Sequence, residues 1–231
     1  MVQEHSPVHP GSPGQQRRAA TTTDTGEGAE TGGAETRRRI LAVALELFAV
    51  KGYAGTSIRD ITERMGLTKA SLYYHFASKE QILDAVTAPL KADFEALGEL
   101  AKSQPPPPAA EVLSRVVDML SRRVAMIRVL MGDPSSQRGQ HRPPEDYLEN
   151  IATSMAGGDG PAALVRARCA LGAAQFGAFI TASRAVAADP PFGEASDRGR
   201  TERILAGDEH VLSDAERREI VDAALRALAL P

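Results

Sequence analysis

Apolar residues recur at spacings of three and four along most of the chain, which is the pattern of amphipathic helices. The pattern starts at Glu35 and predicts a helix that ends at Lys51 and Gly52, a cation followed by a glycine. The apolar face of this helix comprises Ile40, Leu41, Ala44, Leu45, Leu47 and Phe48. Because no segment alternates convincingly between apolar and polar residues, the sequence predicts an all-α fold.

Two short helices follow the first one. Thr56 and Ser57 are good N-cap residues for a helix that Gly66 ends, and its inward positions are Ile58, Ile61 and Met65. Leu67 fills the turn, and Thr68 caps a third helix over Lys69–Phe76. Two short helices joined by a tight glycine-containing turn, here at about 57–76, are typical of a helix-turn-helix unit.

The rest of the chain is also predicted to be helical. Ser78 and Gln81 match a capping box for a helix that runs toward Lys102. Further helices are expected at about 109–131, 145–156, 161–187 and 213–230, the last opened by a second capping box at Ser213 and Glu216, with loops at 104–108, 132–144, 157–161 and 188–200. Pro89 would clash with the carbonyl of Ala85, which predicts a kink or break near 86–90.

Residues 1–34 differ from all the rest in composition. They are rich in Ser, Thr, Gly, Pro and Glu, and they are expected to form a disordered tail in which His5 and His9 are solvated. The predicted organisation is therefore a tail at 1–34, a helix-turn-helix domain at 35–80 and a helical domain at 81–231. The sequence shows neither a signal peptide nor a long apolar run, so we expect a cytoplasmic protein without a membrane partner.

Charge is distributed unevenly along the 231 residues. The formal net charge is −3, yet residues 36–80 carry eight basic and four acidic side chains, which leaves −7 for the rest. A basic module on an acidic body suits a partner with phosphate groups. The single cysteine, Cys169, excludes an internal disulfide and is expected to be a small buried side chain.

The third helix has an outward face suited to DNA. At about 100° per residue, Leu72 and Phe76 point inward. The outward side and its flanks are expected to carry Lys69, Ala70, Ser71, Tyr73, Tyr74 and His75. Lysine and hydroxyl groups can hydrogen-bond base edges, and a small residue allows close approach to the groove.

Residues Thr36–Lys79 resemble the DNA-binding domain of the TetR family of bacterial transcriptional regulators. The resemblance rests on ILAVALELF, on GY followed by TS, on the spaced I-x-x-I-x-x-x-x-G-L pattern and on SLYYHFASKE. It implies that Lys69, Ala70, Ser71 and Tyr73 face bases and that Tyr74 and His75 contact the DNA backbone or the groove wall. It also implies that Thr56 and Lys79 touch phosphates. Two alternatives stay open: Tyr73 packing partly under the first helix, and His75 in a capping or packing role.

The resemblance further implies a homodimer on a pseudo-palindromic double-stranded DNA operator. The implied protein is a repressor that a small molecule releases. Small residues along 161–187 and an apolar face along 213–230 favour a four-helix dimer interface, although both helices could instead pack within one subunit.

A pocket for a largely apolar effector would need apolar and aromatic walls. The candidates are Phe94, Met119, Met126, Tyr147, Phe176 and Phe179, with Leu97, Met131 and Met155 as further possibilities. All of them would equally suit an ordinary core. Arg123 and Arg128 could meet an acidic ligand or simply be exposed.

Two other classes of protein remain alternatives. An enzyme is disfavoured because the chain lacks GxSxG, GxxxxGK[ST], HExxH and GxGxxG motifs, and we expect no catalytic residues, cofactor or metal. A DNA-binding module without a ligand is disfavoured by the roughly 150 residues that follow the helix-turn-helix.

Overall fold

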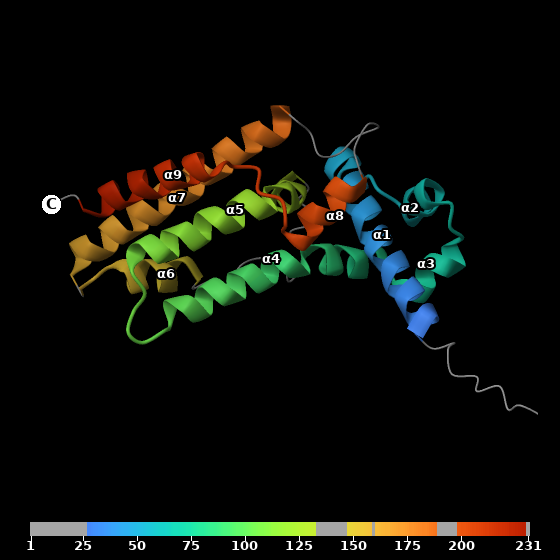
Figure 1. Cartoon of the computed structure of the whole chain (residues 1–231), viewed down its shortest axis with the longest axis horizontal. Coiled ribbons are helices and arrows are strands. Elements are labelled where there is room, and N and C mark those ends of the chain that lie inside the picture. Colours follow the sequence, from blue (N-terminus) through green and yellow to red (C-terminus); the bar gives the residue numbers. More distant parts are fainter. Residues whose placement is uncertain (1–26, 133–146, 159, 189–197, 230–231) are drawn as a thin grey trace, which may run out of the picture.

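A computed structural model describes residues 27–132, 147–158, 160–188 and 198–229, and every regular element among them is an α-helix (Figure 1). The helices are α1 (Glu27–Lys51), α2 (Ile58–Met65), α3 (Lys69–His75), α4 (Lys79–Ala101), α5 (Ala109–Gly132), α6 (Tyr147–Met155), α7 (Pro161–Ala188), α8 (Arg198–Ala206) and α9 (Asp214–Leu228). Helices α1–α3 form one end of the molecule, and α4–α7 with α9 form an elongated bundle (Figure 1). The all-α prediction is confirmed.

Local sequence signals set the ends of the short helices. Ser57 caps α2 in a reciprocal box with Asp60, and Gly66 ends α2 at φ 67°, a left-handed conformation that favours glycine. Thr68 caps α3 by accepting from the backbone N–H of Ser71. The residues assigned to the core from the sequence are all buried: Phe48, Ile61, Leu72 and Phe76. The predicted helix-turn-helix is therefore present.

The boundary of the N-terminal tail differs from the prediction. Helix α1 begins at Glu27 rather than Glu35, so residues 27–34 are helical. Acidic residues favour a helix N-terminus, and the Thr36 hydroxyl donates to the carbonyl of Gly32 at 2.9 Å, which supports this first part of α1. Residues 1–26, with His5 and His9, lie outside the described residues.

Helix α4 runs without a break from Lys79 to Ala101, with Pro89 inside it. Of the predicted kink or break near 86–90, the break is therefore wrong and the kink stays a prediction. Val86 and Leu90 are buried on either side of Pro89, and this packing holds the helix together. The Thr87 hydroxyl adds a hydrogen bond to the carbonyl of Leu83, at 2.9 Å.

Helix α7 packs along α5 and α9. Its buried face consists of Ala167, Ala170, Leu171, Ala174, Ala178, Ala182 and Val186. Gly177 allows close approach, because a Cβ there would lie 3.6 Å from Ile220 of α9. Among the described helices, α7 alone is long and apolar enough to cross a membrane by length and composition. Here it packs as one helix of the bundle.

Helix α8 was not predicted from the sequence. It includes residues 198–200, which were expected to belong to a loop, and it lies between the bundle and α1 (Figure 1). Its residues are mostly polar, so they show no apolar period, and its burial depends on tertiary contacts of Thr201 and Ile204.

Candidate functional site

Helix α3 presents a polar and aromatic surface to solvent. Lys69 and Ala70 are exposed, and Tyr73 and Tyr74 are 49% and 86% exposed. The inward residues Leu72 and Phe76 are 0% and 3% exposed, so α3 is anchored by one face while the other is free. Tyr73 does not pack fully under α1.

The other two predicted contacts on α3 are less accessible. Ser71 is half-buried, and its backbone N–H is used by the Thr68 cap. His75 is also half-buried, and its ring meets Tyr74 edge-on with centroids 5.1 Å apart. The contact orients Tyr74, because edge-to-face aromatic pairs prefer a definite geometry.

Thr56 is not placed to contact phosphate. Its side chain is buried, with the residue 1% exposed, and its hydroxyl donates to the carbonyls of Gly52 at 2.8 Å and Leu47 at 3.2 Å. The expected phosphate contact is therefore wrong for this side chain. Thr56 instead ties the last turn of α1 to the start of α2.

Lys79 is held within the helix-turn-helix unit. Its Nζ donates to the backbone carbonyls of Tyr53 and Thr56, both at 2.9 Å, and lies 4.2 Å from the centroid of the Tyr53 ring. An ammonium group has three donors, so one remains for a phosphate. Lys79 has a structural role that the sequence did not indicate.

Some charged side chains of the helix-turn-helix unit form ion pairs, and others do not. Lys51 donates to Asp60 at 2.6 Å across the turn between α1 and α2. That hydrogen bond, together with those from Ser57, holds the pKa of Asp60 well below its usual range. Within the described part of the chain, no carboxylate forms a salt bridge with Lys69. Its charge is therefore available to a ligand.

A buried polar contact joins α8 to α1. The Thr201 hydroxyl donates to Glu46 Oε1 at 2.9 Å, and these residues are 0% and 6% exposed. Glu46 also lies 3.8 Å from Arg64 of α2. The helix-turn-helix is thus connected to the bundle through α8.

Arg123 anchors the other end of α8 and is not free for a ligand. Its Nε donates to Asp93 of α4 at 2.7 Å, and its Nη1 donates to the carbonyl of Leu205 at 3.1 Å. Gly207 has φ 80°, a left-handed conformation that favours glycine, and a Cβ there would lie 2.8 Å from the Arg123 guanidinium.

The aromatic and methionine residues proposed for a pocket do not line one cavity. Met119, Met126 and Tyr147 are core residues, exposed by no more than 3%. Phe94 packs edge-on against Tyr147 at 4.9 Å, whereas Phe176 is 70% exposed. Of the six residues in this prediction, Phe179 alone lines the cavity described below. Burial in this core raises the pKa of the Tyr147 hydroxyl.

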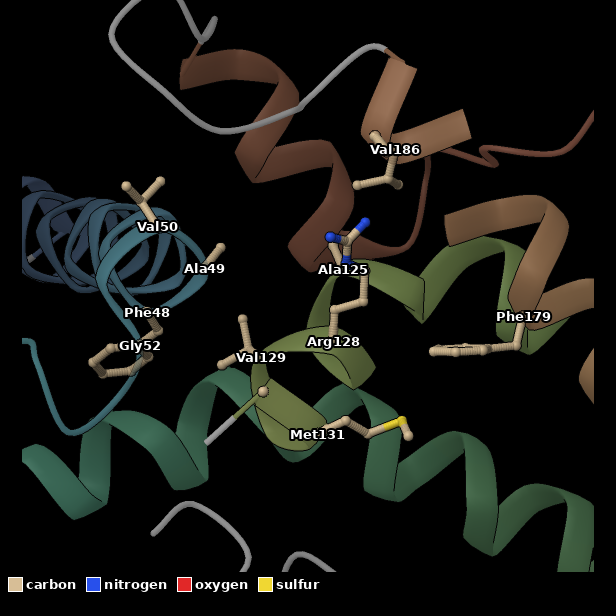
Figure 2. Close-up of a pocket in the computed structure, with 12 residues that line it drawn as sticks. Phe48, Ala49, Val50, Gly52, Ala125, Arg128, Val129, Met131, Phe179 and Val186 are labelled. Atoms are coloured by element: carbon tan, nitrogen blue, oxygen red, sulfur yellow. The ribbon is translucent and has the colours of Figure 1, made fainter. Parts of the chain in front are cut away.

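A cavity of about 620 Å³ lies where the ends of α1, α5 and α7 meet (Figure 2). Its walls are Phe48, Ala49, Val50 and Gly52 at the end of α1, Ala125, Arg128, Val129, Met131 and Gly132 on α5, and Phe179, Val186 and Ala187 on α7. The sequence missed this site because side chains from three distant segments form it.

Comparisons with known proteins agree with this geometry. Residues 40–86 match the sequence model of the tetR family of bacterial regulatory proteins. The HTH-type transcriptional repressor Rv3405c of Mycobacterium tuberculosis is 35% identical over 113 residues, which are 49% of this chain and 56% of that protein. The HTH-type transcriptional regulator SrpR of Pseudomonas putida is 39% identical over 64 residues, 26% of this chain and 30% of that protein.

One solved structure resembles the whole fold. The crystal structure of Mycobacterium smegmatis AmtR aligns with a TM-score of 0.52 and 26% identity, over 84% of this chain and 86% of that chain. The chain spans only 30% to 56% of the length of the curated relatives named above.

The exposed α3, the buried α1–α3 core and these matches identify α1–α3 as a helix-turn-helix DNA-binding domain like those of bacterial transcriptional regulators. The match over residues 40–86 confirms that this part of the chain resembles the TetR family of bacterial regulatory proteins, as the sequence predicted for Thr36–Lys79.

Proposed function

We propose that the protein is a cytoplasmic, ligand-responsive repressor that binds a pseudo-palindromic operator as a homodimer. The observation that carries this proposal is the free face of α3, where Lys69, Ala70, Tyr73 and Tyr74 are exposed above a buried anchor. In this proposal α3 enters the major groove and Lys69 hydrogen-bonds guanine. Ser71, His75 and Lys79 contribute contacts at the edge of this surface, while Thr56 holds the fold.

The proposed dimer interface is an apolar stripe on α7. Its exposed residues are Val165, Cys169, Gly172, Ala173 and Phe176, which recur at helical spacing on the face opposite the buried alanines. Helix α9 packs beside α7, so two such pairs can form a four-helix interface. The stripe also includes Cys169, which is exposed rather than buried as expected.

A gel-shift titration tests DNA binding. The duplex is an inverted repeat from the regulatory region beside the protein's own gene, with a shuffled duplex as competitor. Lys69→Ala is expected to weaken specific binding by about 1–3 kcal/mol, the cost of losing a bidentate base contact. Lys102→Ala is the matched control, because Lys102 is exposed at the far end of α4. Unchanged affinity in Lys69→Ala would remove this lysine from the site.

A further inference from the structure

The cavity at the ends of α1, α5 and α7 contains one charged side chain among apolar walls. Arg128 supplies the charge, and its Nη1 donates to the backbone carbonyl of Ser183 at 3.2 Å. In the part of the chain that the structure describes, Arg128 has no carboxylate partner in a salt bridge. Since a guanidinium has five N–H donors, most of them remain available.

A second polar group lies next to this cation. Ser183 follows Phe179 by four residues on α7 and precedes Val186 by three, so it shares their helix face. Its Oγ is buried and has no hydrogen-bond partner within the described residues. Ser183 is not among the residues that line the cavity, so the polar end of the site rests on Arg128.

The apolar walls leave hydrophobic surface uncovered. Val50 of α1 and Met131 of α5 both line the cavity and are 63% and 61% exposed. Large exposed apolar side chains around a concavity favour a ligand with an apolar body. The volume of about 620 Å³ is that of a small-molecule site.

We propose that this cavity binds an amphipathic carboxylate, with the carboxylate on Arg128 and the apolar body against Val50, Met131 and Phe179 (Figure 2). The inference rests on the ligand response in the proposed function and names its chemical class. A neutral ligand would leave the guanidinium without a charged partner, and a cation would be repelled by it.

The position of the cavity connects occupancy to DNA binding. Its α1 wall includes Phe48 and Gly52, within the segment whose carbonyls accept the Thr56 hydroxyl. A ligand that moves the end of α1 therefore also moves the start of α2. In this connection Arg128 binds the ligand, and Thr56 joins the end of α1 to the helix-turn-helix.

Isothermal titration calorimetry with decanoate and with 1-decanol tests the proposal. Wild-type protein is expected to bind one decanoate per chain about 10-fold more tightly than decanol, and Arg128→Gln is expected to abolish that difference. Arg115→Gln is the matched control, since Arg115 is exposed on the same helix outside the cavity. Ala49→Trp, which fills the cavity from α1, is expected to prevent binding of both compounds.

Three results would overturn the proposal: no saturable binding of decanoate to the wild type, equal preference for decanoate in Arg128→Gln and wild type, or full binding in Ala49→Trp. The circular dichroism spectrum of each variant checks that it is folded. The titration contains no DNA, so its failure would overturn the ligand class alone. The gel-shift with Lys69→Ala judges DNA binding separately.

Discussion

Lys79 joins three parts of the helix-turn-helix unit through a single ammonium group. It begins α4, it donates to two carbonyls in the segment between α1 and α2, and it covers the Tyr53 ring. Tyr53 in turn donates its hydroxyl to Glu80 at 3.2 Å. The pKa of Glu80 lies below its ordinary value, mainly because backbone and Ser78 hydrogen bonds favour the carboxylate.

We therefore expect Lys79→Ala to reduce stability and not only DNA affinity. Loss of two charge-assisted hydrogen bonds and a cation–π contact should lower the free energy of unfolding by about 1–3 kcal/mol. Urea denaturation followed by circular dichroism measures this change. Lys91→Ala, at an exposed position of α4, is the control. Equal midpoints for Lys79→Ala and wild type would show that Lys79 does not hold the unit together.

Single side chains were the hardest features to predict from the sequence. Periodicity placed Leu72 and Phe76 inside and Tyr74 outside, because these positions follow from the helical repeat. The surroundings of the Thr56 and Cys169 side chains were not predicted from the helical repeat. The hydroxyl of Thr56 turns inward to two carbonyls of α1, and Cys169 lies on the exposed side of α7. Both outcomes depend on neighbours that lie outside the local pattern.

Helix α8 is short, yet it contacts both the helix-turn-helix unit and the bundle. Thr201 contacts Glu46 of α1, and the carbonyl of Leu205 accepts from Arg123 of α5. It therefore contacts the helix-turn-helix unit through Thr201 and the bundle through Leu205. Capping residues allowed α2, α3 and α9 to be located from the sequence, whereas the polar sequence of α8 shows no apolar period.

A double-mutant cycle tests the connection between α8 and α1. Glu46→Gln removes the charge of the acceptor and Thr201→Val removes the donor of one buried hydrogen bond, so their effects on the free energy of unfolding should not add. We expect a coupling energy of about 0.5–3 kcal/mol from urea denaturation. Glu46→Gln combined with Ser114→Ala is the control, because Ser114 bonds within α5. Additive effects for Glu46 and Thr201 would rule out a direct interaction.

Among the described residues, α7 presents an apolar stripe that the other described helices do not cover. Phe176 is 70% exposed on α7, and Val165 is 53% exposed on the same stripe. Exposed aromatic side chains on an apolar stripe are typical of protein interfaces. This stripe is the surface on which we expect two chains to meet.

Phe176→Glu should convert the dimer to monomer, because two carboxylates would be buried at the interface. Sedimentation velocity at micromolar concentration measures the change. Leu148→Glu is the control, at an exposed apolar position on α6. Modification of Cys169, the sole cysteine, provides a second measurement of dimer formation. Maleimide should react with it slowly in the wild type and rapidly in Phe176→Glu. A monomeric wild type would contradict the proposed interface.

The central claim is that two copies of α3 read an inverted repeat, and selection of bound duplexes from a random library tests it most directly. The predicted result is enrichment of two inverted half-sites about one helical turn, ~34 Å, apart. Lys69→Ala should relax the base preference in both half-sites equally. Enrichment of no sequence, or of a single unrepeated site, would contradict the account.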